Sequence, residues 1–102
     1  MEGRTRAGII GVGETIYRTR IPEANYPELA QEAALKALSA AGMTPEDIDA
    51  VVFSMAPTEF MGVTDADRWA IDAVGGRGKT FMRVHTGGAT GGSAAQAGYL
   101  HV

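Results

Sequence analysis

Residues 83–99 read RVHTGGATGGSAAQAGY, and this stretch decides the fold of the chain. Residues 80–85 favour a β-strand, whereas the small residues that follow the glycines favour a helix. A strand that turns directly into a helix brings several unpaired backbone N–H groups to one point. Because such a point attracts negative charge, the stretch predicts a binding site for an anionic group.

Four of the six residues at positions 87–92 are glycines. Glycine allows φ > 0 and lets a ligand approach the backbone without meeting a Cβ atom. The same residues also suit a tight strand-to-helix turn in which small side chains serve close helix–sheet packing. A third interpretation is a phosphate- or nucleotide-binding module, because Gly87, Gly92 and Ser93 have P-loop spacing, although the lysine of that motif is missing.

The rest of the chain alternates between apolar runs and amphipathic stretches, which is typical of a parallel α/β sheet. Pro27 suits the first turn of a helix that Gly42 ends, and TPED at 44–47 predicts one short helical turn. The predicted order is therefore βαβαβα, with the helices packed on the sheet. We expect strands at 7–13, 50–54 and 80–84, and helices at 27–41, 64–74 and 93–102.

Three features of these elements leave alternatives open. Residues 7–13, AGIIGVG, suit a buried parallel strand, and their Gly-x-Gly begins a dinucleotide fingerprint, but Ile16 stands where a third glycine is needed. Trp69 is interpreted as a core or interface residue. The loop at 55–62 is interpreted as a simple connection or as a loop on the ligand side of the sheet.

Composition excludes several kinds of site. The chain has 102 residues, a formal net charge of −3 and no cysteine. Its length suits one small domain, and its charge gives no reason to expect nucleic acid or an anionic membrane as partner. Without cysteine there is no disulfide, thiolate metal site or cysteine nucleophile, and two histidines without a carboxylate cluster predict no metal. No signal peptide or membrane span is evident, so we expect a cytoplasmic protein.

The C-terminal helical run reaches residue 102 without a glycine, proline or polar tail to end it. Three parallel strands would also leave sheet edges that need covering. We therefore expect residues 1–102 to be the N-terminal part of a longer protein.

These elements together resemble the N-terminal region of the thiolase superfamily. The resemblance rests on the order of elements, the alanine-rich helix followed by GMTPEDID at 42–49, the strand VVF at 51–53 and the glycine stretch. It is closest to the lipid-transfer-protein or sterol-carrier type of thiolase. It covers nearly the whole chain, but only the opening part of a family member.

The family signature Val-Asn-x-x-Cys-x-Ser-Gly aligns without gaps with residues 84–91. Val84 and Gly91 agree, and Thr90 is a near match for the serine. His85 replaces the asparagine, and Gly88 replaces the cysteine that accepts the acyl group. Glycine has no nucleophile, so a covalent acyl-enzyme at this position is excluded.

The resemblance implies an acyl-CoA-processing protein that breaks or forms a C–C bond on a CoA thioester, in the manner of the cysteine-free branch that resembles steroid side-chain retro-aldolases. His85 would then be catalytic, with Gly88 at the vacant nucleophile position. The substrate would be bound by the neighbouring residues Gly87, Ala89, Thr90, Gly91 and Gly92. The other acid–base groups would lie beyond residue 102.

The resemblance also implies a homodimer, a small partner subunit with a zinc ribbon and an OB fold, and no cofactor apart from the CoA thioester that is the substrate. One alternative is a non-catalytic subunit that binds acyl-CoA or lipid, or that only completes an oligomer. His85 would in that case be a hydrogen-bonded structural histidine at the end of a strand.

Overall fold

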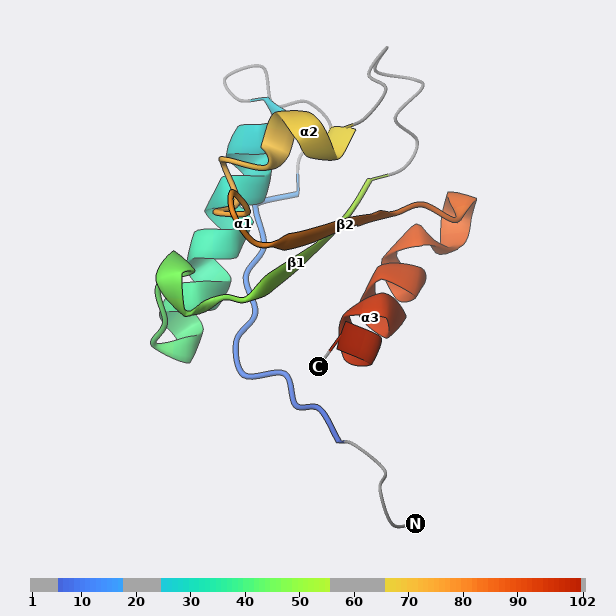
Figure 1. Cartoon of the computed structure of the whole chain (residues 1–102). Coiled ribbons are helices and arrows are strands. Elements are labelled where there is room, and N and C mark those ends of the chain that lie inside the picture. The colour runs from blue at the N-terminus through green and yellow to red at the C-terminus, as the bar shows by residue number, and fades with distance from the viewer. Residues whose placement is uncertain (1–5, 18–24, 56–65, 102) are drawn as a thin grey trace.

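The structure, a computed structural model, describes residues 6–17, 25–55 and 66–101. Within these ranges the chain forms a small α/β arrangement of three α-helices, two 3₁₀ turns and two strands (Figure 1). In chain order the elements are α1 (Tyr26–Ala41), η1 (Pro45–Asp47), β1 (Ala50–Ser54), α2 (Ala66–Ala70), β2 (Thr80–Val84), η3 (Gly87–Ala89) and α3 (Thr90–His101).

The two strands pair in parallel, as the sequence predicts. Their register runs from Ala50 opposite Thr80 to Ser54 opposite Val84, so both carboxyl ends lie at one edge of the sheet. Figure 1 shows α1 and α2 on one side of the strands and α3 on the other. The turn that leads into α3 follows the carboxyl end of β2 and therefore lies at that edge, and α3 then contacts both strands.

Residues 7–13 form no strand, so the prediction of a buried first strand is wrong, and over the described residues the order begins with α1. Ile9 is 88% exposed and Val12 is 73% exposed. The segment lies against α1 instead: a Cβ atom at Gly11 would be 2.3 Å from the carbonyl oxygen of Ala37. The absence of side chains at Gly11 and Gly13 thus allows the backbone to lie on the helix.

Local signals at both ends explain α1. The side chain of Asn25 accepts a hydrogen bond from the backbone N–H of Glu28 (3.0 Å), and the Glu28 carboxylate accepts one from the N–H of Asn25 (3.3 Å). This reciprocal capping box satisfies two N–H groups that the helix itself cannot bond. Pro27 lies in the first turn and Gly42, at φ 70°, ends the helix, which confirms both predictions.

Helix α2 is shorter than the predicted range of 64–74. Turns replace the helix from residue 71 onward, and the N–H of Gly76 bonds the carbonyl oxygen of Ile71 (2.7 Å). Residues 64 and 65, where the predicted helix begins, lie outside the described residues, as does most of the 55–62 loop. Trp69 is 72% exposed, so its interpretation as a core residue is wrong, and a role at an interface stays a prediction.

The described residues bury little apolar surface. Ala70 is the one hydrophobic side chain among them that is fully buried. Phe53 and Phe81 stack across the sheet with their ring centroids 6.3 Å apart. Gly76 makes room for this pair, since a Cβ atom there would be 2.4 Å from Cδ2 of Phe81. Of the helices in the described ranges, none has the length and hydropathy needed to cross a bilayer.

Candidate functional site

The candidate site is the turn between β2 and α3, residues 85–92, which we call the glycine turn. It begins where β2 ends beside Ser54 of β1 and continues through η3 into α3. Gly87 has φ 63°, in the left-handed region that favours glycine. The turn thus uses, at Gly87, the positive φ that glycine allows.

Hydroxyl groups hold the glycine turn in shape. Thr90 is only 5% exposed, and its Oγ1 donates a hydrogen bond to the carbonyl oxygen of Gly87 (2.6 Å). Oγ1 of Thr90 also accepts a hydrogen bond from the backbone N–H of Thr86 (3.0 Å). A second contact joins Oγ1 of Thr86 and Oγ of Ser93 (2.7 Å). The turn is thus fixed from within before any ligand arrives.

Part of the predicted set of backbone donors is used inside the turn. The N–H of Ala89 bonds the carbonyl oxygen of Thr86 (3.3 Å), and the N–H of Thr90 bonds that of Gly87. The N–H groups of Ala89 and Thr90 are therefore not among the unpaired donors that the sequence predicts for this turn. The N–H of Gly87, by contrast, makes no hydrogen bond with the described part of the chain.

The glycines of the turn lie beside open space. A Cβ atom built at Gly87, Gly91 or Gly92 would meet no atom within 4 Å, and all three residues are exposed. Close helix–sheet packing within the described residues consequently does not explain why glycine stands at these positions. What remains is a patch of backbone that another molecule can approach closely.

His85 stands at the entrance to the turn, immediately after β2. Its side chain is exposed and makes no hydrogen bond or ion pair with the described residues. If His85 is a hydrogen-bonded structural histidine, its partner does not lie in the described part of the chain. No group of three His, Asp or Glu side chains within the described ranges is placed to hold a metal ion.

This arrangement suits the binding of a polarised oxygen. The exposed imidazole and the open glycine backbone belong to one turn, which follows the carboxyl end of β2, and ligands of parallel sheets bind at that edge. No family model and no curated protein matches this chain. What the turn can do must therefore be judged from its own residues and geometry.

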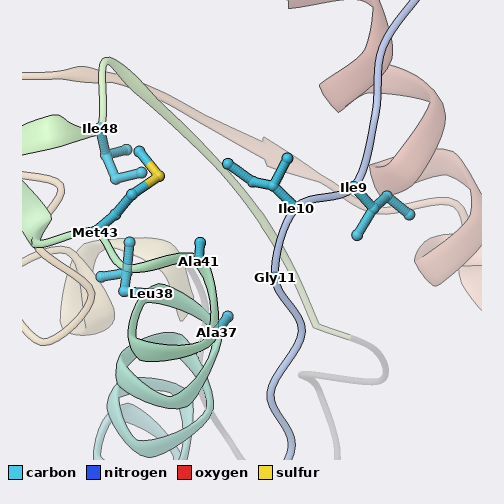
Figure 2. Close-up of a pocket in the computed structure, with 8 residues that line it drawn as sticks. All are labelled: Ile9, Ile10, Gly11, Ala37, Leu38, Ala41, Met43 and Ile48. Atoms are coloured by element: carbon cyan, nitrogen blue, oxygen red, sulfur yellow. The ribbon is translucent and has the colours of Figure 1, made fainter.

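An apolar groove of about 260 Å³ lies elsewhere, between the N-terminal segment and the end of α1 (Figure 2). Ile9 and Ile10 line it on one side, and Leu38, Met43 and Ile48 line it on the other. Ile48 precedes the amino end of β1, whereas the glycine turn follows the carboxyl end of β2. The groove and the turn therefore lie at opposite ends of the sheet and form separate features.

The hydroxyl contacts are the part of the site that sequence reasoning missed. Thr90 was predicted to bind substrate, but its hydroxyl is occupied within the turn, and a contact with substrate stays a prediction. The hydroxyl of Ser93 forms a hydrogen bond with that of Thr86. Their spacing, with polar hydroxyls at 86, 90 and 93, matches one face of a helix and is the signal that could have revealed the contact.

Proposed function

We propose that the glycine turn binds the thioester carbonyl of an acyl-CoA, and that the protein breaks or forms a C–C bond on that thioester without an acyl-enzyme. One observation carries the proposal: Gly87, Gly91 and Gly92 present open backbone in the same turn that begins with the exposed side chain of His85. The resemblance to the cysteine-free thiolases supports the choice of ligand.

The chemistry fits a site that has no nucleophile. In a retro-aldol cleavage a base removes the proton of the β-hydroxyl, the bond between the α and β carbons breaks, and its electrons form a thioester enolate. The enolate oxygen needs preorganised hydrogen-bond donors, and the enolate then takes a proton at the α carbon. The N–H of Gly87 and the imidazole of His85 would be donors to that oxygen, and Gly88 need supply nothing.

A non-catalytic subunit that binds acyl-CoA is the second candidate. The observation in its favour is that His85 has no orienting partner among the described residues, whereas acid–base histidines are usually held by one. Both candidates bind the CoA ester, but only the enzyme converts it to products.

Binding at the open backbone is tested by placing a large side chain in the space beside it. We expect Gly92→Leu to raise the Kd for a short saturated acyl-CoA at least about tenfold, measured by titration calorimetry, because the new side chain occupies the space above the turn. Gly98→Leu is the matched control, since Gly98 lies in the same helix and a Cβ atom there also meets nothing within 4 Å. Equal Kd values for both variants would contradict the assignment.

The role of His85 is tested by turnover of a β-hydroxyacyl-CoA, with and without a co-expressed partner subunit. His85→Ala is expected to lower kcat by about 10²–10⁴ while the unfolding temperature stays the same, because the side chain is exposed. Glutamine in His85→Gln can still donate a hydrogen bond but cannot act as a base. Turnover of this variant therefore shows whether His85 acts as a hydrogen-bond donor or as a base.

Several results of that assay would change the proposal. Unchanged turnover in His85→Ala would remove this residue from the site. A stable acyl group on the turn, detected by mass spectrometry, would refute catalysis without an acyl-enzyme. Binding without turnover would favour the subunit, and ATP or GTP binding that no CoA ester displaces would favour a phosphate module.

A further inference from the structure

We propose that the apolar groove between the N-terminal segment and the end of α1 binds an uncharged, hydrocarbon-like small molecule of about ten carbon atoms. The groove lies at the other end of the sheet from the glycine turn, so the inference is independent of the proposed function. It rests on the residues that line the groove, on its volume and on the way in which the N-terminal segment is held.

The described residues that line the groove have no nitrogen or oxygen atom in their side chains. Five of them are isoleucine, leucine or methionine, and the other three are alanine or glycine. A charged or strongly polar group placed among them would lose its hydration without gaining a side-chain partner, which is costly. The lining therefore selects a ligand whose bound part is uncharged and apolar.

The large apolar side chains belong to two walls that face each other. Figure 2 shows Ile10 directed from the N-terminal segment toward Met43 and Ile48. Ile9 and Ile10 are nevertheless 88% and 70% exposed, so the groove is open to water. A ligand between the walls would remove apolar surface of both from water, and the hydrophobic effect favours this.

The volume of the groove sets the size of its ligand. It measures about 260 Å³. An apolar cavity of about 150 Å³ in another protein takes up one benzene molecule, so by proportion this groove accommodates about ten carbon atoms. A stable interface with another protein buries about 800 Å² on each side, which needs a far larger surface. The size therefore favours a small molecule over a strand or helix of another chain.

The N-terminal segment is fixed on α1 at its far end. A Cβ atom at Gly13 would lie 2.4 Å from a backbone oxygen of α1, and Nζ of Lys36 donates a hydrogen bond to the carbonyl oxygen of Glu14 (3.2 Å). The backbone of residues 7–13 makes no hydrogen bond with the described part of the chain. The wall formed by residues 9–11 can therefore shift to fit a ligand without breaking a hydrogen bond among the described residues.

The test is a titration of the isotope-labelled whole chain with naphthalene, a flat ring, and with octanol, a flexible chain, monitored by amide chemical shifts. We expect saturable shifts at residues 9–11, 37–43 and 48, with a Kd below about 1 mM, and no shifts at the glycine turn. The probe with the lower Kd identifies the ligand as a ring or a chain.

Two pairs of variants locate the binding. Ile10→Ala is expected to raise the Kd at least about fivefold, because it removes most of one apolar wall. Val12→Ala is its matched control, since Val12 is 73% exposed in the same segment but does not line the groove. Ala41→Leu fills the groove and should raise the Kd at least about tenfold. Ala40→Leu places the same side chain on the neighbouring exposed residue and should leave the Kd unchanged.

Four results would overturn the proposal. The first is the absence of saturable shifts with either probe, and the second is an equal Kd for Ile10→Ala and Val12→Ala. Shifts centred on the glycine turn would place the apolar ligand there instead. Shifts at the groove that depend on protein concentration without any probe would show that a second copy of the chain covers it.

Discussion

Thr90→Val should lower the free energy of unfolding by about 2–3 kcal/mol. The substitution keeps the shape of the side chain but removes the oxygen that donates to Gly87 (2.6 Å) and accepts from the N–H of Thr86 (3.0 Å). Thr90 is 5% exposed, so water replaces these contacts poorly, and an unsatisfied buried group costs roughly 1–3 kcal/mol. Denaturant unfolding monitored by circular dichroism measures the change.

Two variants control for this result. Ser93→Ala removes only the contact with Thr86, both groups of which water can reach, so we expect a loss of about 0.5–1 kcal/mol. Thr90→Ser keeps the oxygen and loses one methyl group, which should cost less than valine does. If the valine variant is as stable as the wild type, the hydroxyl does not hold the turn.

Gly13→Ala is expected to lower the free energy of unfolding by about 1–3 kcal/mol. The added Cβ atom would lie 2.4 Å from the carbonyl oxygen of Ala33 and 2.6 Å from the backbone nitrogen of Ala37. Both are backbone atoms of α1, which cannot rotate out of the way. The N-terminal segment must therefore move off the helix.

The matched control for this substitution is Gly8→Ala, in the same segment, where a Cβ atom meets nothing within 4 Å. It should leave the stability unchanged within about 0.5 kcal/mol. Stability is compared at one protein concentration, because association changes the apparent value. Faster amide exchange at residues 6–17 in Gly13→Ala, but not in Gly8→Ala, would confirm the displacement. Similar behaviour of the two variants would contradict the packing on α1.

The parts of the fold that sequence predicts are those with local causes. Helix α1 has a proline in its first turn and a glycine at its end, and both signals lie within a few residues of the element. Strands β1 and β2 are found at their predicted positions because each is an apolar run between turn residues. Their parallel pairing follows from the helix between them.

The prediction of a first strand is wrong because a strand needs a neighbouring strand to pair with, and an apolar stretch of sequence does not specify that neighbour. Residues 7–13 have the apolar side chains of a buried strand, yet Gly11 and Gly13 lie on α1. The same limit applies to the site. The density of glycine predicts the turn and allows the positive φ found at Gly87, but the contacts of Thr90 depend on how the turn closes in space.

The register of the sheet has a consequence for how the chain reaches its native state. Ala50 pairs with Thr80, thirty positions further along, so the ladder forms only after a long loop has closed. Capped helices such as α1 can form within about a microsecond, whereas long-range parallel pairing is slow. An early species with α1 formed and β1 still unpaired would expose Val51, Val52 and Phe53, and during synthesis this is the stretch most in need of protection by a chaperone.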